Sequence, residues 1–502
     1  MASIAEFFLA IDQSTSATKA LLFSKEGRVV DQETCPHQQI YPKPGWVEHD
    51  AEEIFQNTLK VTTTLLNRHP DKLNNLLALS ITNQRETFVV FDRDTGQPLH
   101  NAIVWQCRRG VSICYQLVEE GKEVLVHQLT GLRIDTYFPA CKLRWLLDSR
   151  PDLRARLIDG SALFGTIDTY LVYRLSNCKV YATDFTNASR TLFFNIEKLA
   201  WSRELCEVFG LPFSSLPEIR ESSAWFGDTD LVGFLDRRIP IYGVMGDSQA
   251  ALFAQKCFQP GSVKVTFGTG SSILLNIGHE LRLSASGTVT ALAWVLKGKP
   301  TYAYEGIINF TGATIAWLRD QMKLIENVAE SEQIALSVPD SDGVYFVPAF
   351  VGLSAPYWRP DVRAAILGMT PSTTKAHIVR AALESIGYIV TDVIKAMSKD
   401  AGINLNLIYA DGGAVNNSYL LQFVSDLNQS TMLASRVPEL SALGAVFCGG
   451  LGMNIFKSLS VLETLPVDYT RYTPSLDPQI VRQLLSGWQE SIQQILYQQR
   501  QG

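Results

Sequence analysis

Residues 7–23 read FFLAIDQSTSATKALLF, which is an apolar strand, a turn of small polar residues and a second apolar strand. The same arrangement returns at residues 262–278 as SVKVTFGTGSSILLNIG. Short apolar runs on either side of small turn residues are typical of paired strands. Mixed helical and strand patterns follow each unit, which favours an α/β architecture with two domains of related fold. We expect the boundary near residue 255, before the Gln-Pro-Gly turn at 259–261, which gives domains 1–255 and 256–502.

Length and composition agree with this interpretation and exclude several functions. A chain of 502 residues exceeds what one hydrophobic core usually serves. Its formal net charge of −6 opposes nucleic-acid binding, and no apolar stretch approaches the ~20 residues of a membrane helix. The eight cysteines form no C-x-x-C pair, which is typical of reduced thiols in a cytoplasmic protein. The start, MASIAEFFLAIDQ, has no basic region before its apolar run and is expected to be a strand rather than a signal peptide.

Two long helices are expected in the second half. Residues 375–397 carry apolar side chains at helical spacing and predict a half-buried helix. The C-terminal stretch from Asp477 has an N-cap residue, a proline at the first helical position and an apolar stripe that includes Ile480 and Trp488. We expect this last helix to dock on the C-terminal domain.

Three turns of small residues follow apolar strands and could bring backbone N–H groups close to phosphate oxygens. A tight strand-to-strand turn needs the same residue types, so any one of them alone is better explained by backbone freedom, whereas the three together leave both interpretations open. None matches the Walker pattern, so a P-loop is excluded. The three turns are Asp12-Gln13-Ser14-Thr15-Ser16, Gly268-Thr269-Gly270-Ser271-Ser272 and Asp411-Gly412-Gly413-Ala414.

A strand that ends in Arg85 and Glu86 offers a polar ligand site. Neighbouring residues on a strand point to opposite faces unless a bend turns both toward one ligand. The alternative is an exposed edge with solvated charges. Trp105 and Tyr137 would by themselves be core residues.

Asp247 follows the apolar strand that ends at Gly246 and opens a helix. Helix N-caps favour aspartate, so a cap is one interpretation. The other is a carboxylate at the end of the sheet where open α/β folds bind ligands. Both remain open on the sequence alone.

Together these segments resemble the FGGY carbohydrate-kinase family, and within it the glycerol kinases. The resemblance runs through nearly the whole chain. It rests on IYPKPGWVEHD (40–50), ITNQRET (81–87), AIVWQCRR (102–109), FGTIDT (164–169), TDFTNASR (183–190), GDSQAALF (246–253), FGTG (267–270), APYW (355–358) and DGGAVNN (411–417).

The resemblance implies two actin-like, ribonuclease-H-like domains that enclose a cleft. It implies that Asp247 is the general base, that Asp12 organises Mg²⁺, and that ATP donates the phosphoryl group. The implied polyol pocket consists of Arg85, Glu86, Trp105, Tyr137, Asp247, Ser248 and Ser272. The implied nucleotide-binding residues are Thr15, Ser16, Lys19, Thr269, Gly312, Gly413 and Asn417.

Six positions depart from the glycerol-kinase pattern. Three of them are Ala316 in place of a glutamine near the nucleotide, Ser354 in place of a glycine and Thr136 in place of a proline. The other three lie nearer the implied substrate and phosphates. Ser248 replaces a glutamine that reaches the substrate, Ser272 replaces a phenylalanine against the glycerol backbone, and Lys19 replaces an arginine. The implied function is ATP-dependent phosphorylation of a small polyol, with glycerol as the first candidate. A four- or five-carbon polyol or ketose is the alternative, and a non-catalytic actin-like nucleotide-binding module is a remote one. The expected partners are a small polyol or sugar and further copies of the chain in a homodimer or homotetramer.

Overall fold

The computed structural model describes residues 6–359, 361–405, 407–437 and 439–498. The two strands predicted from residues 7–23 form an antiparallel pair with Asp12 opposite Lys19. They belong to a six-stranded sheet whose order is β13 (Trp225–Thr229), β14 (Ile239–Gly246), β5 (Leu76–Asn83), β1 (Phe7–Gln13), β2 (Ala17–Ser24) and β3 (Val29–Pro36).

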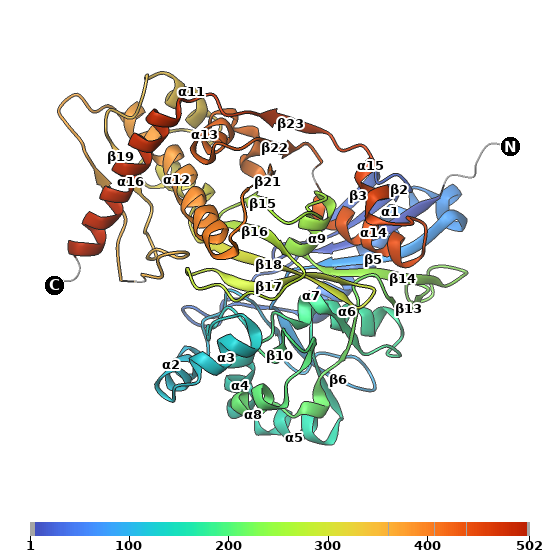
Figure 1. Ribbon diagram of the computed structural model, residues 1–502. Helices are drawn as coiled ribbons and strands as arrows, with labels where there is room; N and C mark the ends of the chain where they lie inside the picture. Colours follow the sequence, from blue (N-terminus) through green and yellow to red (C-terminus); the bar gives the residue numbers. More distant parts are fainter. Residues whose placement is uncertain (1–5, 360, 406, 438, 499–502) are drawn as a thin grey trace.

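A second sheet of seven strands contains the other predicted pair. Its order is β17 (Val289–Leu296), β18 (Lys299–Ile308), β16 (Ser271–Gly278), β15 (Ser262–Phe267), β21 (Leu407–Gly412), β22 (Met432–Ser435) and β23 (Tyr469–Tyr472). The run β3-β2-β1-β5-β14 has two antiparallel and then two parallel pairings, and β18-β16-β15-β21-β22 repeats this pattern. The repeated order confirms the predicted fold of two related α/β units, which Figure 1 shows side by side.

The parallel strands of both sheets end level with their neighbours. Asn83 of β5 pairs with Gln13 of β1 and with Gly246 of β14. In the second sheet Phe267 of β15 pairs with Gly412 of β21. Because ligands of open α/β sheets bind beyond the carboxyl ends of the strands, this register places the candidate turns where a ligand site is expected.

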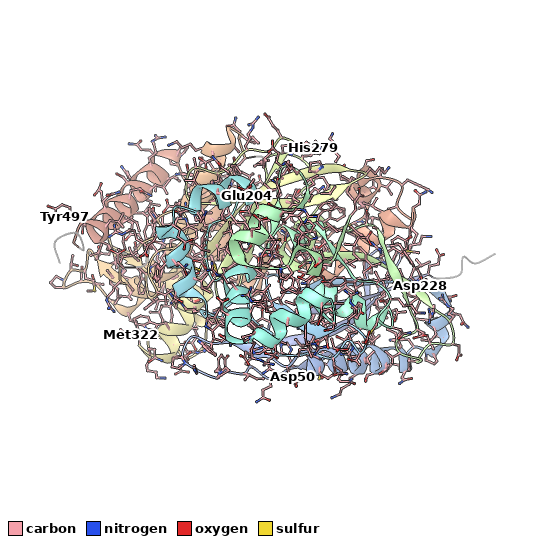
Figure 2. The ribbon with its side chains drawn as sticks, turned by 90° about the horizontal axis from the view of Figure 1, so that it is seen from below. Asp50, Glu204, Asp228, His279, Met322 and Tyr497 are labelled. Atoms are coloured by element: carbon pink, nitrogen blue, oxygen red, sulfur yellow. The ribbon has the colours of Figure 1, made fainter. Side chains whose placement is uncertain are left out.

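A helical layer extends from the first sheet, in the lower part of Figure 1. It surrounds a four-stranded sheet, β4 (Glu48–His49), β7 (Ala102–Ile103), β6 (Phe88–Asp92) and β8 (Ala162–Thr166). Its helices are α2 (Val111–Glu119), α3 (Glu123–Thr130), α4 (Pro139–Ser149), α5 (Pro151–Asp159) and α8 (Arg203–Phe209). Figure 2 looks onto this layer from below, with the exposed Glu204 of α8 in front and Asp50 and Met322 at the edge of the outline.

Two helices join the halves of the molecule. Helix α9 (Asp247–Ala254) packs against α14 (Leu440–Gly452), which also contacts β14, β5 and β1. A Cβ atom at Gly444 would collide with the carbonyl oxygen of Ala250, so the close approach requires glycine there. One buried apolar cluster contains Phe8 and Met245 from the first half and Leu274 and Phe447 from the second. The two sheets therefore share a continuous core on this side.

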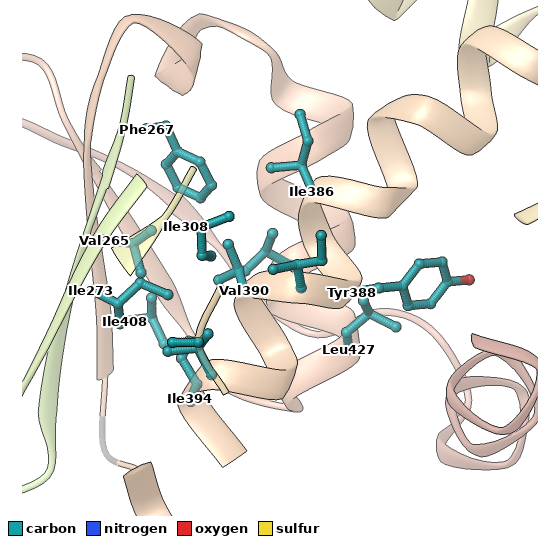
Figure 3. Packing of buried hydrophobic residues seen from close by; sticks show 14 of the residues in the cluster. Val265, Phe267, Ile273, Ile308, Ile386, Tyr388, Val390, Ile394, Ile408 and Leu427 are labelled. Atoms are coloured by element: carbon teal, nitrogen blue, oxygen red, sulfur yellow. The ribbon is translucent and has the colours of Figure 1, made fainter. Parts of the chain in front are cut away.

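Helix α12 (Lys375–Ala401) was expected to be half-buried, and this prediction is wrong for its centre. All residues from 381 to 394 are buried. On one side Ile386, Val390 and Ile394 pack toward the strands of the second sheet (Figure 3). On the other side α11 (Glu330–Leu336) and α13 (Ser418–Asn428) cover the helix. The apolar periodicity of residues 375–397 indicated one buried face of the helix. It could not show that other helices cover the opposite face.

The predicted C-terminal helix is α16 (Pro478–Gln498). Its buried Trp488 stacks on Tyr388 of α12 with ring centroids 5.1 Å apart, whereas Ile480 of the expected stripe is 46% exposed. Ile480 therefore lies off the buried face, which reaches the first turn through Val481. Among the described residues no helix is long and apolar enough to cross a membrane.

Candidate active site

Asp247 lies at the corner where β14 ends and α9 begins. The N-cap residue of α9 is Gly246, and the Asp247 carboxylate accepts only the neighbouring Ser248 N–H, at 2.7 Å, from the helix backbone. Arg85 Nε lies 3.2 Å from Asp247 Oδ1, and the aspartate side chain keeps 39% of its surface exposed. Asp247 is therefore not the N-cap of its helix, and its carboxylate remains open to a ligand.

Arg85 and Glu86 stand in a bend directly after β5, with Glu86 at a φ of 62°. A glutamate in the left-handed region is uncommon and is held there by its surroundings. The bend lets both side chains turn toward the same cavity, and both are buried. The alternative of an exposed edge with solvated charges is wrong.

Two residues that the sequence analysis did not select complete this cluster. Arg190 pairs with Glu86 (Nε to Oε1, 2.6 Å) and with Glu305 of β18 (Nη1 to Oε2, 2.5 Å). Arg85 also binds Glu305, with 2.7 Å between Nη2 and Oε1. Two arginines and two glutamates thus neutralise one another in a site where all four side chains are buried, as buried charges must.

The pKa values of the two glutamates in this cluster are shifted in opposite directions. Burial by itself would raise the pKa of Glu305, but Arg190 and Arg85 outweigh it and lower the pKa to about 2. Burial raises the pKa of Glu86 above its usual value despite the same two arginines, because Glu305 also repels it. Burial would lower the pKa of Arg85, but Glu305 and Glu86 raise it well above the usual value. Of the two glutamates, Glu305 is therefore the one whose ionised form the arginines stabilise more.

A cavity of about 500 Å³ opens beside this cluster. The indole of Trp105 and the ring of Tyr137 form adjacent walls, with centroids 5.3 Å apart, and Trp105 Nε1 donates to Thr15 Oγ1 at 3.0 Å. Ser248 and Ser272 meet in its wall, with 3.5 Å between the hydroxyl oxygens. The predicted residues that line it are Thr15, Arg85, Glu86, Trp105, Tyr137, Asp247, Ser248, Thr269 and Ser272. An apolar wall combined with a few convergent charges is typical of a small-molecule site.

A second cavity of about 220 Å³ adjoins the first and shares Asp247, Ser248 and Thr266 with it. Its wall also contains Asp12, Lys264, Asp411, Gly412 and Glu439. Burial raises the pKa of Asp12 to about 7, against the effect of Lys19 and with help from Glu439 and Asp247. Burial also raises the pKa of Asp411 and lowers that of Lys264. Within the described residues no group of three or more His, Cys, Asp or Glu could hold a metal without further ligands.

The remaining predicted nucleotide residues line neither cavity. Lys19 pairs with Glu439 at 2.8 Å, and Ser16 is exposed. Gly312 donates its N–H to the Gly268 carbonyl at 3.1 Å and leaves no room for a Cβ atom. Gly413 follows the cavity-lining Gly412, and a Cβ atom at Gly413 would meet open space. Asn417 accepts the Leu420 N–H at 2.9 Å as the N-cap of α13.

The segment 183–190 holds three parts of the site in place. Thr186 Oγ1 accepts the Gly246 N–H at 2.8 Å, directly before Asp247. Asn187 and Asn83 exchange two amide hydrogen bonds of 3.0 and 3.1 Å at the end of β5. Arg190 neutralises Glu86 and Glu305, as described above. The buried Asp184 accepts from Thr186 Oγ1 at 2.7 Å and anchors the segment.

Sequence reasoning missed these supporting residues, although it offered some signals. Glu305 is an isolated acid inside the apolar strand TYAYEGII (301–308), and Arg190 closes the quoted motif TDFTNASR. Gln249, whose Oε1 accepts from Arg85 at 3.1 Å, gave no signal beyond its place after Asp247.

Family models, related sequences and a solved structure all match this chain over most of its length. Models of the N-terminal and C-terminal domains of the FGGY family of carbohydrate kinases match residues 7–254 and 263–453. Glycerol kinase 1 of Thermotoga maritima is 45% identical over 490 residues, which cover 98% of this chain and 99% of that protein. The glycerol kinase of Brevibacillus brevis is 46% identical over 487 residues, 97% of each chain. The crystal structure of Plasmodium falciparum glycerol kinase with ADP matches with a TM-score of 0.94 at 36% identity and covers 98% of both chains.

Proposed function

Because the chain belongs to the FGGY family of carbohydrate kinases, we propose that it transfers the γ-phosphoryl group of ATP to a hydroxyl of glycerol. The products are glycerol 3-phosphate and ADP. The polyol binds in the larger cavity, and the phosphates bind along the smaller one. In this proposal residues 1–255 and 256–502 form the two domains that enclose the cleft.

One observation supports this assignment above all others. Asp247 lies in the wall that the two cavities share, so its carboxylate is reached from the polyol side and from the phosphate side. A general base must lie within hydrogen-bond reach of the hydroxyl whose proton it takes. A pure nucleotide switch needs no second cavity with buried arginine and glutamate pairs, which disfavours the non-catalytic module.

Residues of this chain would bind the acceptor and take its proton during phosphoryl transfer. Arg85 and Glu86 donate to and accept from neighbouring hydroxyls, while Trp105 covers the carbon chain. The Asp247 carboxylate accepts the proton of the attacking hydroxyl. The hydroxyl oxygen forms its bond to the γ-phosphorus as the bond from that phosphorus to the bridging oxygen of ADP breaks. Thr269 and Gly270 of the 268–270 turn lie in the wall of the larger cavity and would offer backbone N–H groups to the transferring phosphate.

The wall of the smaller cavity fits a magnesium–nucleotide complex. Mg²⁺ uses one or two protein carboxylates together with waters and phosphate oxygens, and Asp12 and Asp411 would supply these carboxylates. The raised pKa of both groups supports the fit, because a cation favours the ionised form of a buried carboxylate. When bound, the ion neutralises charge on the phosphates.

A longer polyol or ketose is the second candidate acceptor. Ser248 and Ser272 lie in the cavity wall where bulkier side chains would narrow the space, and a further chamber of about 310 Å³ adjoins it. Both spaces share the wall formed by Tyr137, Ile307 and Asn309.

The test is ADP release with saturating ATP and a panel of glycerol, erythritol, xylitol, ribitol, xylulose and ribulose. We expect the highest kcat/KM with glycerol. A higher value for a four- or five-carbon compound would favour the second candidate, and no turnover with any acceptor would overturn both.

A further inference from the structure

Lys142 is a fully buried lysine next to the polyol cavity whose role the proposed chemistry leaves open. It lies in the first turns of α4, and none of its surface is exposed. Lysines are rarely buried without an acidic partner. Within the described part of the chain no carboxylate lies within ion-pair distance of its amino group, so its charge is compensated in another way.

The amino group of Lys142 forms its hydrogen bonds with backbone carbonyl oxygens. It donates to the carbonyl oxygens of Val104 at 3.1 Å, Trp105 at 3.3 Å and Tyr137 at 3.2 Å. A protonated lysine has three N–H donors, so these three bonds use all of them. No neutral side chain of similar length can make the same set.

Two of these acceptors belong to the aromatic walls of the cavity. Trp105 lies in the irregular segment after β7, and Tyr137 lies in the irregular segment before α4. Neither segment is held by a strand ladder, and the two are far apart in sequence. Lys142 therefore connects the two loops at the very residues whose rings stand 5.3 Å apart.

We propose that Lys142 is a positioning residue that holds the Trp105 and Tyr137 loops at a fixed spacing and so sets the width of the polyol site. The proposal rests on the proposed function in so far as the cavity binds the acceptor. A loss of this spacing weakens acceptor binding and leaves the nucleotide side unchanged, because neither loop lines the smaller cavity.

The ionisation of the Lys142 amino group gives a second way to test whether it positions the two loops. Burial lowers the pKa of Lys142 to about 8, and the groups that face it and oppose this shift are Cys107, Glu86, Asp135 and Cys141. Cys114 of α2 in turn contacts Cys141. A neutral amine has two N–H donors instead of three. We therefore expect one of the three backbone bonds to be lost as the pH rises through 8.

The experiment compares Lys142→Met and Lys142→Arg with Arg144→Met as a matched control. Arg144 is on the same helix and donates to the Val208 carbonyl at 3.3 Å, away from the cavity. For Lys142→Met we expect KM for the acceptor to rise about tenfold or more, with KM for ATP within about twofold of wild type. Arginine should restore part of the loss, and Arg144→Met should leave both KM values near wild type.

Two further readouts keep the proposal testable if a variant folds poorly or no acceptor is turned over. In wild type the acceptor KM should rise between pH 7 and 9, and this rise should be absent from Lys142→Met. Hydrogen–deuterium exchange should increase at residues 102–110 and 132–138 in Lys142→Met and not in Arg144→Met. An acceptor KM unchanged by Lys142→Met, or exchange raised equally in both variants, would overturn the proposal. Absence of turnover in wild type would instead contradict the proposed function, and the exchange result would still decide the role of Lys142.

Discussion

Replacing Glu305 with glutamine removes one of the two buried carboxylates that neutralise Arg85 and Arg190. The side chain of Glu305 has no exposed surface, and it contacts Arg85 at 2.7 Å and Arg190 at 2.5 Å. Glu86 would then be the remaining buried carboxylate beside two buried guanidinium groups, and their other acidic partner would be the partly exposed Asp247, 3.2 Å from Arg85 Nε. Breaking a buried pair by removing one partner typically costs about 3–5 kcal/mol of stability.

The ionisation of Glu305 leads to a similar magnitude. Its pKa is lowered from the usual 4.5 to about 2. At about 1.36 kcal/mol per pKa unit, this difference corresponds to about 3 kcal/mol. Since the pKa is lower in the folded protein, the stabilisation is complete above pH 4.5 and is lost as the pH falls toward 2. The free energies of unfolding of wild type and Glu305→Gln should therefore differ by about 3 kcal/mol at pH 7, and by less at pH 3.

Urea unfolding at the two pH values measures this difference, and steady-state kinetics measure its effect on the site. We expect the acceptor KM of Glu305→Gln to rise by about tenfold or more, since Arg85 loses its shortest ion pair. Glu384→Gln is the control. Glu384 is also buried and accepts from Arg380 at 2.8 Å, but it lies on α12 outside both cavities. It should lose stability with an unchanged KM. If Glu305→Gln costs less than about 1 kcal/mol at pH 7, the buried ion cluster does not hold the site as described.

Four further outcomes are expected. Asp247→Asn should keep its melting temperature and lose about 10²–10⁴-fold in kcat, and a folded variant with most of its turnover would remove Asp247 as the base. Excess chelator should abolish turnover, excess Mg²⁺ should restore it, and full activity in chelator would contradict a metal requirement. Ser272→Phe should raise the kcat/KM ratio of glycerol to xylitol by about tenfold, whereas an unchanged ratio would show that this position does not limit acceptor length. Thr186→Val removes the acceptor for the Gly246 N–H and should lower kcat by about tenfold, with recovery in Thr186→Ser; equal activity of both variants would rule out positioning of Asp247 through Thr186.

Sequence by itself determined the local units of this protein. The strand–turn–strand stretches at 7–23 and 262–278 and the helix after Asp247 form as predicted, because short-range apolar patterns and small turn residues largely decide such units. The resemblance of quoted motifs also indicated the residues that line the larger cavity, including Arg85, Trp105 and Tyr137. Their roles in catalysis and binding stay predictions until the experiments above are done.

Only the tertiary structure decided which groups meet. Arg85 and Glu305 are 220 positions apart in the chain, and Asn83 and Asn187 are 104 apart. Local periodicity indicates whether a side chain is buried and does not identify its partner, so neither pair could be predicted. The same reason applies to Lys142, which reads as an ordinary helix residue and whose amino group binds carbonyls of two separate loops. A buried charge is compensated by whichever groups the packing of distant segments brings to it, and that packing depends on the whole fold.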